Sequence, residues 1–302
     1  MGENLLKELQ SNKKYYASKT LKVVLGKFEE FEGSRTLPLK RIDAVYLEKF
    51  EQFLKTEYGN SDTTINKNFL PIRKIINRAL KAHLMANDPF RIYSVPSRSR
   101  PKQKTKLTIE QIRDIESLEL KKDSWELHVR NAFLFSFYSG GIRFGDICCL
   151  KWKNVKNGKL YYQMNKNEKG FSTELNDFQK EILSRYSGAS DEFIFPFLNS
   201  HKDYSDPLEL RRNISTKNVL VNGKTKKGKE TGLKKIAVMA GIDENVSFHV
   251  SRHSFAQYAV SEKGLDVYEL MQTLRHSKIE TTQAYLKSLN EELADKAMKK
   301  VF

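Results

Sequence analysis

Five polar side chains in the second half of the chain have the chemistry needed to break a phosphodiester bond without a metal. They are, in chain order, Arg143, His249, Arg252, His276 and Tyr285. Arginines balance the charge of a phosphate, histidines move or hold protons, and a tyrosine oxygen can act as the nucleophile. The set therefore predicts an attack by a tyrosine on a nucleic-acid phosphate.

The first arginine follows a break in the chain. Gly140 and Gly141 let the backbone turn tightly, and a helix carrying Arg143 is expected over 142–150. Asp146 lies one helical turn beyond Arg143, so its carboxylate could hold the guanidinium from behind. The competing interpretation is an exposed ion pair on a helix, which contributes little to stability.

His249 and Arg252 are also one helical turn apart, so they are expected to share one face of a helix. An alternative is a metal pair formed by His249 and His253, since histidines at i and i+4 can share zinc. The metalloprotease motif with this spacing has Glu after the first histidine, and this chain has Val250 there. We therefore expect no metal site, and we expect His253 to be structural.

A second alternative concerns the segment 211–235, which holds nine basic residues and one acidic residue. Within it, 223–230 nearly spells a phosphate-binding P-loop and follows the apolar residues 219–221. Glu230 stands where that motif needs Ser or Thr to bind magnesium, so no nucleotide cofactor is expected. A DNA-facing loop and a merely solvated loop both stay open for this segment.

In their order and spacing the five residues resemble the tyrosine recombinase (phage integrase) family. Segment 140–147 is similar to the family's first arginine box and 249–256 to its second. Segment 274–277 is similar to the family's Leu-Gly-His-Ser, with Arg275 in place of Gly, and 281–285 matches the segment of the nucleophile. The resemblance covers nearly the whole chain from about residue 13.

The resemblance implies a role for each of these residues. Tyr285 would attack the scissile phosphate and form a 3′-phosphotyrosyl link while the 5′ oxygen leaves. Arg143 and Arg252 would bind phosphate oxygens through their planar forks. His249 would help to accept the tyrosine proton, and His276 would hydrogen-bond a non-bridging oxygen.

The family also uses a lysine on the turn of a β-hairpin to protonate the leaving oxygen. Aligned on the hairpin expected from 160–164 and 171–175, Lys166 fits best and Lys169 is the runner-up, while Asn167 stands where the family usually has Thr. Cleavage by these residues would need neither a metal nor ATP, because the phosphotyrosine conserves the bond energy.

The elements that must position these residues indicate a mostly α protein with a small antiparallel β-sheet (α+β). Three apolar stripes at helical spacing occur within 13–93, so about a dozen residues are expected to precede the first helix. The resemblance identifies 1–95 as a helical, SAM-like core-binding domain that binds DNA. A linker follows over 96–106, where every second residue from 98 onward is basic, so it could lie along a phosphate backbone.

The catalytic domain is expected over 107–302. Helices are expected at 108–118 and 125–138, ahead of the first arginine, and again after the hairpin. The last helix, within 288–302, has an apolar face. The resemblance suggests that it docks in trans on a neighbouring protomer, and packing on its own domain is the alternative.

The composition of the chain limits the classes of partner that it can bind. The net charge of +16 favours a polyanion, nucleic acid first and an acidic membrane second. No apolar run approaches the roughly 18 residues that span a bilayer. Cys148 and Cys149 are adjacent, and neighbouring cysteines rarely bridge, which indicates a reducing cytoplasm.

The leading hypothesis is therefore site-specific recombination of double-stranded DNA, whether integration, excision or inversion. The expected form is a homotetramer on DNA, without a membrane, and accessory DNA-bending proteins are a further class of partner. A type IB topoisomerase is the alternative enzyme, and a DNA-binding regulator with a vestigial site is the alternative from another class. The separate helical domain and the tail after Tyr285 favour recombination, and the complete set of catalytic positions disfavours the regulator.

Overall fold

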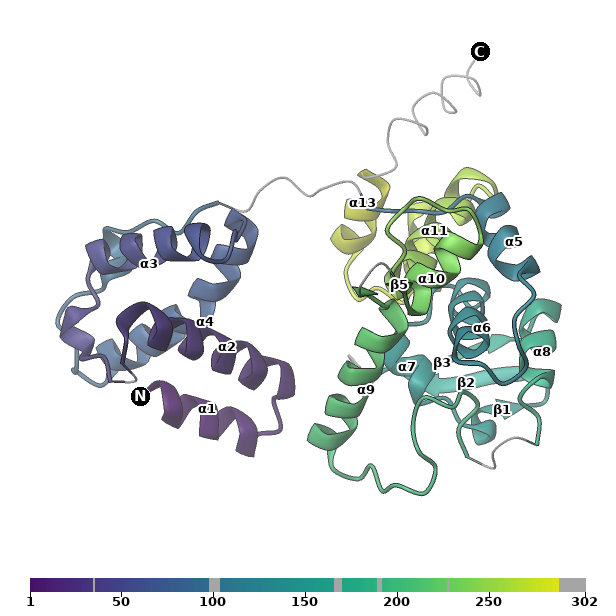
Figure 1. Ribbon diagram of the computed structural model, residues 1–302, viewed down its shortest axis with the longest axis horizontal. Helices are drawn as coiled ribbons and strands as arrows, with labels where there is room; N and C mark the ends of the chain where they lie inside the picture. The colour runs from purple at the N-terminus through teal and green to yellow at the C-terminus, as the bar shows by residue number, and fades with distance from the viewer. Residues whose placement is uncertain (35, 98–103, 166–169, 189–191, 227–228, 288–302) are drawn as a thin grey trace, which may run out of the picture. The chain divides into compact units, whose positions relative to one another are not determined.

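A computed structural model gives the structure of the protein (Figure 1). It describes the chain apart from residues 35, 98–103, 166–169, 189–191, 227–228 and 288–302, and it gives no side-chain placement for 225–226 and 284–287. The chain divides into two compact units, Met1–Lys102 and Gln103–Phe302. Helices dominate both, and a small antiparallel sheet lies in the second, so the predicted mostly α class is confirmed. None of the described helices is long and apolar enough to cross a bilayer.

Helices are the regular secondary structure of the first unit among its described residues. Its helices are α1 (Gly2–Ser11), α2 (Tyr15–Glu32), α3 (Ala44–Thr56) and α4 (Asp62–Lys81), with short 3-10 turns at Leu39–Arg41 and Pro89–Arg91. The expectation that a dozen residues precede the first helix was wrong, because α1 lies there. Leu5 and Leu9, one helical turn apart, are buried with Leu21 of α2 in a small apolar cluster. A helix this short depends on such packing for its stability.

Helix α4 has two faces of opposite character. One face buries Ile65, Phe69, Ile72 and Ile76 in the core of the unit. The other carries the basic side chains described below. This division follows from helical periodicity, since residues three and four apart lie on the same side.

The second unit contains the remaining elements. Its helices are α5 (Ile109–Ser117), α6 (Trp125–Tyr138), α7 (Phe144–Cys148), α8 (Asp177–Ser184), α9 (Pro207–Asn222), α10 (Gly232–Met239), α11 (Phe248–Ser261), α12 (Val267–Leu274) and α13 (Ile279–Lys287). The helices expected at 108–118 and 125–138 are α5 and α6. Thr108 caps α5 in a capping box with Gln111, and the Ser124 side chain caps α6.

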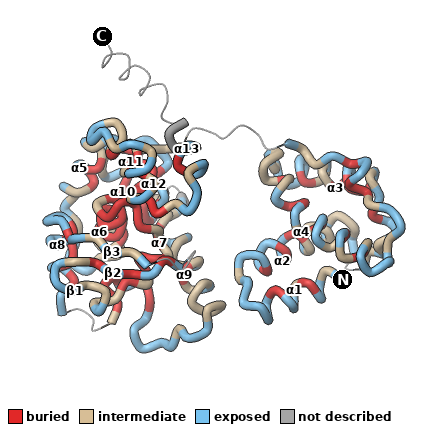
Figure 2. Tube along the Cα trace, turned by 180° about the vertical axis from the view of Figure 1, so that it is seen from behind, coloured by how far each residue is buried: buried red, intermediate tan, exposed pale blue. Residues whose placement is uncertain are grey.

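Helix α6 forms the centre of the second unit. Every residue from Val129 to Phe137 is buried, and the helix packs against α8, α10 and α11. Figure 2 shows the buried stretches gathered on α6 and the helices around it. A helix that is buried on all sides forms part of a core. Because this buried helix ends at Tyr138, it holds in place the start of the glycine turn that precedes Arg143.

A three-stranded antiparallel sheet lies beside this core. Its strands, in spatial order, are β1 (Val155–Lys156), β2 (Lys159–Gln163) and β3 (Gly170–Glu174). In the register of β2 and β3, Tyr162 lies opposite Phe171. The expected hairpin of 160–164 and 171–175 is present with its strands shifted by one residue, and β1 is an additional strand.

The helix expected over 142–150 is shorter than predicted. Gly140 and Gly141 have φ of +72° and +74°, and Arg143 is still extended at φ −70° and ψ 148°. The helix α7 begins only at Phe144, so Arg143 is its N-cap residue. Two left-handed residues followed by extended backbone delay the helix, and Arg143 lies on the turn before it.

The P-loop alternative fails on topology. Residues 219–221, which would have to be a strand, lie inside α9. The following residues form a short hairpin of β4 (Thr225–Lys226) and β5 (Lys229–Glu230) before α10. A P-loop connects a strand to a helix, so this segment has a different architecture.

Candidate active site

Arg252 joins the segments that the sequence singled out. It lies on α11 and is only 2% exposed. Its Nη1 donates to the carbonyl oxygen of Gly141 at 2.7 Å, and its Nη2 donates to the carbonyl oxygen of Leu274. Gly141 is two residues before Arg143, and Leu274 is two residues before His276. One guanidinium therefore brings three distant segments together.

Arg143 lies at the edge of this junction and is half-buried. Its Nη1 is 3.7 Å from the sulfur of Met164, the residue just after β2. Arg143 thus lies between the glycine turn and the hairpin. Because it precedes the helix, its guanidinium contacts Met164 instead of lying on the surface of a helix as an ion pair.

Asp146 does not form the predicted hydrogen-bonded support of Arg143. Its buried carboxylate instead accepts a hydrogen bond from the backbone N–H of Asn165 at 2.8 Å, and the Asn165 amide donates to the carbonyl oxygen of Gly145 at 3.0 Å. Burial raises the pKa of Asp146, although the Asn165 hydrogen bond and the charge of Arg143 lower it. Asp146 therefore anchors the start of the hairpin turn, and Arg143 acts on it only as a nearby charge.

The two histidines of α11 have different environments. His249 is exposed, and its ring lies edge-on to that of His253, with centroids 4.6 Å apart. His253 is buried, and burial lowers its pKa to about 3, helped by the nearby positive charges of His249, Lys104 and Arg252. His253 is thus neutral at ordinary pH, as a structural histidine should be. In the part of the chain that is described, no group of three or more His, Cys, Asp or Glu side chains could hold a metal ion.

His276 is tied to the helix that carries the predicted nucleophile. Its Nδ1 lies 2.9 Å from the hydroxyl of Thr282, which is fully buried on α13. Tyr285 lies one helical turn after Thr282 in the same helix, and its side chain is outside the described residues. The two candidate lysines, Lys166 and Lys169, also lie outside them.

Arg275 was noted in the sequence only as a departure from the family pattern, yet it is buried in this region. Its backbone is left-handed, with φ 57° and ψ 42°, and its side chain is 8% exposed. Its Nη2 donates to the carbonyl oxygen of Ser139 at 2.8 Å, and its guanidinium carbon lies 3.5 Å from the centre of the Phe171 ring. The signal that could have found it is an arginine at a position where the backbone favours glycine.

The electrostatics of the site are set by three guanidinium groups and one carboxylate. Burial raises the pKa of Tyr162 to about 12, while Arg275, Arg252 and Arg143 each lower it by their charge. All three arginines therefore act on one ring, and Asp146 is the acidic group among them. Among the described residues, this excess of positive charge around one ring suits the binding of a phosphate group nearby.

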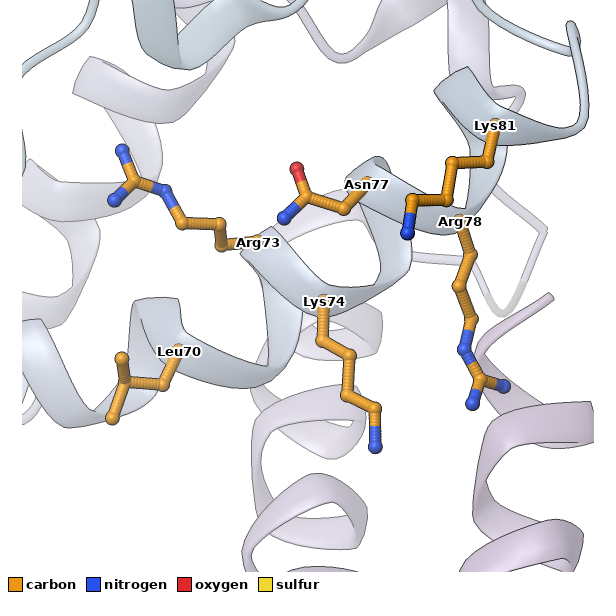
Figure 3. A pocket seen from close by; sticks show the side chains of 6 residues that line it. All are labelled: Leu70, Arg73, Lys74, Asn77, Arg78 and Lys81. Atoms are coloured by element: carbon orange, nitrogen blue, oxygen red, sulfur yellow. The ribbon is translucent and has the colours of Figure 1, made fainter.

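The first unit offers a separate basic surface on α4. A shallow hollow there is lined by Leu70, Arg73, Lys74, Asn77, Arg78 and Lys81 (Figure 3). Arg78 forms a two-pronged ion pair with Glu8 of α1, with N···O distances of 2.6 and 2.9 Å. Arg78 thus pairs with an acidic partner on α1, whereas Arg73, Lys74 and Lys81 add positive charge to the surface.

The two cysteines are unpaired, as the sequence indicated. Cys148 is buried and Cys149 half-buried on the chain just after Asp146. Burial raises the pKa of both thiols. They therefore pack as small apolar side chains.

Comparisons with known proteins match this architecture. The profile of the phage integrase family matches residues 106–292, well over half of the chain, and that of the phage integrase SAM-like domain matches residues 2–95. Tyrosine recombinase XerD of Oceanobacillus iheyensis is 27% identical over 246 residues, which are 80% of this chain and 77% of that protein. Tyrosine recombinase XerC of Pediococcus pentosaceus is 21% identical over 97% of this chain and 95% of its own length.

Solved structures show the same fold. A lambda integrase(75–356) dimer bound to a COC′ core site gives a TM-score of 0.61 at 16% identity, over 94% of this chain and 95% of that one. The XerH site-specific recombinase bound to a palindromic difH substrate gives 0.62 at 20% identity, over 93% and 79%. The chain belongs to the phage integrase family and is a tyrosine recombinase.

Proposed function

We propose that the protein is a site-specific recombinase that cuts and rejoins double-stranded DNA through a covalent bond to Tyr285. The observation that carries the proposal is the placement of Arg252, whose hydrogen bonds to Gly141 and Leu274 join the Arg143 turn to the His276 segment. His276 in turn contacts Thr282, on the helix of Tyr285. These contacts connect the segments that carry Arg143, Arg252 and His276 with the helix of Tyr285, and His249 lies on the same helix as Arg252, which supports the proposal.

The proposed reaction has two mirrored steps. In the first, the Tyr285 oxygen attacks the scissile phosphorus, and the bond from phosphorus to the 5′ oxygen breaks. His249 helps to accept the tyrosine proton, and Lys166, with Lys169 as the runner-up, gives a proton to the leaving oxygen. In the second step a 5′ hydroxyl of a partner duplex attacks the phosphotyrosine and releases Tyr285.

Stabilisation of the pentacoordinate phosphate falls to the remaining residues. Arg143 and Arg252 donate to its oxygens and offset its charge, and His276 donates to a non-bridging oxygen. The buried setting strengthens these interactions, because the effective dielectric constant there is lower than in water. No metal or nucleotide takes part in the proposed steps.

The proposal assigns DNA binding to both units. Residues 1–95 would serve as the core-binding domain, with the basic face of α4 toward the phosphate backbone, and 96–106 would act as a basic linker along the DNA. The charge of Arg73, Lys74 and Lys81 supports this role for α4. Within this linker, residues 98–103 lie outside the described residues.

We further propose that four copies assemble on DNA, with 288–302 docking in trans. This segment lies outside the described residues, and the proposal rests on its sequence pattern. A lambda integrase tetramer has been seen bound to a Holliday junction. The unpaired cysteines agree with the cytoplasm as the compartment. Accessory DNA-bending proteins stay a prediction.

A covalent-capture experiment tests the function directly. The protein is incubated with a library of randomised duplexes that carry a nick, so that a cleaved strand loses a short fragment and cannot be rejoined. Adducts that survive denaturant are isolated and their DNA is sequenced. A recombinase should select one family of sites, in EDTA and without nucleotide, and Tyr285→Phe should give no adduct.

The outcomes separate the alternatives. Recombinant products from two copies of the captured site support recombination, whereas relaxation of a supercoiled plasmid without recombinants indicates a type IB topoisomerase. Specific binding without any adduct would identify a DNA-binding regulator. An adduct that persists in Tyr285→Phe would show that another residue is the nucleophile.

A further inference from the structure

Arg275 combines three features that each oppose folding. Its backbone is left-handed at φ 57° and ψ 42°, a conformation that glycine adopts without the strain of a side chain. Its guanidinium is buried, with 8% of the residue exposed, and burial of a charge is unfavourable. Its Nε, also buried, has no hydrogen-bond partner among the residues that the structure describes. Costly arrangements of this kind concentrate at functional sites.

The side chain makes contacts that join two parts of the site. Nη2 donates to the carbonyl oxygen of Ser139 at 2.8 Å, at the start of the glycine turn that leads to Arg143. The guanidinium stacks on Phe171 of β3 at 3.5 Å and lies 5.5 Å from the ring centre of Tyr162 on β2. Arg275 therefore holds the turn and the hairpin at the same time.

The glycine turn and the hairpin both lie next to Arg143. The turn from Ser139 runs directly into Arg143, and β2 ends beside Met164, whose sulfur is 3.7 Å from Arg143 Nη1. His276 is the next residue after Arg275 in the chain. A planar guanidinium can stack on a ring and donate sideways to a carbonyl, which a lysine ammonium cannot do.

We propose that Arg275 is a positioning residue for strand cleavage, which fixes the glycine turn and the β2–β3 hairpin against the His276 segment and so orients Arg143. The inference rests on the proposed function. The described contacts of Arg275 are with the carbonyl oxygen of Ser139 and the rings of Phe171 and Tyr162, so the proposed role is to position other groups. The strained backbone and the buried charge of Arg275 lower the stability of the fold, and the residue acts on the rate of the chemical step.

The test is Arg275→Gly, because glycine relieves the backbone and removes the clamp. The probe is the nicked duplex captured by the wild-type protein. Single-turnover cleavage should fall at least about 10-fold, since small misplacement of catalytic groups has large effects on rate. Binding of the duplex should change less than about threefold, and the thermal midpoint should stay equal or rise, since a buried charge and a strained backbone are gone.

Three further variants separate the effect of the guanidinium contacts of Arg275 from the effects of its charge and of its strained backbone. Arg275→Lys keeps the charge without the planar fork and should not restore the rate. Phe171→Leu removes the stack from the other side and should slow cleavage in the same way, while Tyr161→Leu, on the exposed face of the neighbouring strand, should not. Amide hydrogen exchange in β2 and β3 should accelerate in Arg275→Gly and in Phe171→Leu.

Each outcome decides the question. Cleavage by Arg275→Gly within about twofold of wild type overturns the inference, and so does a loss of rate that is matched by a loss of stability. Full rescue by Arg275→Lys would assign the effect to charge alone and also overturn it. If the wild-type protein itself forms no adduct, the proposed function fails first, so the two failures are distinct.

Discussion

The Arg252 side chain lies directly against the backbone of Gly141. A Cβ atom added to Gly141 would come within 2.6 Å of Arg252 Cγ and 2.9 Å of its Cα, while the Gly141 carbonyl oxygen accepts a hydrogen bond from the same side chain at 2.7 Å. The glycine is therefore required by a close approach as well as by its positive φ of +74°. This contact sets the distance between the first arginine turn and α11.

Gly141→Ala should be more harmful than the same change at a matched glycine. Gly158 has nearly the same φ of +71°, but a Cβ there meets nothing within 4 Å. Both variants carry the left-handed strain of about 1–2 kcal/mol, and only Gly141→Ala adds overpacking of about 1–3 kcal/mol. Urea unfolding should show that difference, and cleavage should fall by about 10²-fold in Gly141→Ala alone. Equal effects of the two changes would mean that the contact with Arg252 is unimportant.

Arg143→Ala and Arg252→Ala should differ in what they damage. Each should slow cleavage by about 10²-fold or more, as expected for the loss of one transition-state donor. Arg252→Ala should also destabilise the protein by about 1–3 kcal/mol, because it leaves buried carbonyl oxygens without a donor, whereas Arg143 is half-buried and should matter less for folding. Arg185→Ala, which removes an exposed ion pair with Glu181, is the control for both readouts. A rate near wild type in either variant would refute the proposed site.

His253 should make stability depend on pH. Its pKa is lowered to about 3 in the folded protein, from an ordinary value of 6.5, so the unfolded chain binds a proton more readily. The contribution of the neutral His253 ring to the free energy of unfolding is fully present above pH 6.5 and is lost as the pH falls toward 3. Between pH 7 and pH 5 the loss is up to about 2 kcal/mol.

The measurement is the free energy of unfolding in urea at both pH values for wild type and His253→Asn. The variant should lose less stability than wild type on acidification, whatever its stability at pH 7. His249→Asn, at the exposed neighbouring position, should retain most of the wild-type pH dependence. Identical pH dependence in wild type and His253→Asn would show that the buried ring is not protonated on unfolding.

The basic face of α4 should contribute to DNA binding through phosphate contacts. Replacing Arg73, Lys74 and Lys81 with Gln should weaken binding to any sequence and reduce the slope of log affinity against log salt by up to about 3, since each contact contributes about 0.9. Arg78 is kept, because its charge is already paired with that of Glu8 on α1.

The matched control removes three charges that already have acidic partners in the second unit. Lys180, Arg185 and Lys202 pair with Asp177, Glu181 and Glu209 at 3.0, 2.8 and 2.6 Å. Their replacement by Gln lowers the net charge equally and should change the salt slope much less. If both triple variants behave alike, the effect is one of net charge and α4 has no special role.

Local signals in the sequence predicted most of the helices. The bounds of α6 follow from an apolar run between a capping serine and a glycine pair, and the hairpin follows from two short runs of β-forming residues. Such features depend on neighbours along the chain. The placement of the Arg143 turn against α11 does not, because it involves a hydrogen bond from Arg252 to Gly141, more than a hundred residues apart.

The same distinction holds for the site. Spacing along α11 predicted that His249 and Arg252 would be close, yet it could not show that one is exposed and the other buried. Asp146 was expected to hold Arg143 because of its helical spacing, and the absence of a helix at Arg143 removed the basis for that prediction. The sequence marked Arg275 as unusual for its position but could not show its contacts, because its partners lie on the hairpin and the glycine turn.

Cys148 is buried and Cys149 is half-buried, so neither native cysteine is an exposed site for thiol labelling. Only a thiolate reacts readily with maleimides, and the raised pKa of Cys148 and Cys149 keeps both thiols protonated at neutral pH. A single cysteine introduced at an exposed position would therefore be the fastest site to label. Fluorophores could be attached to the otherwise native chain, and strand exchange could be followed by energy transfer between labelled protein and labelled DNA.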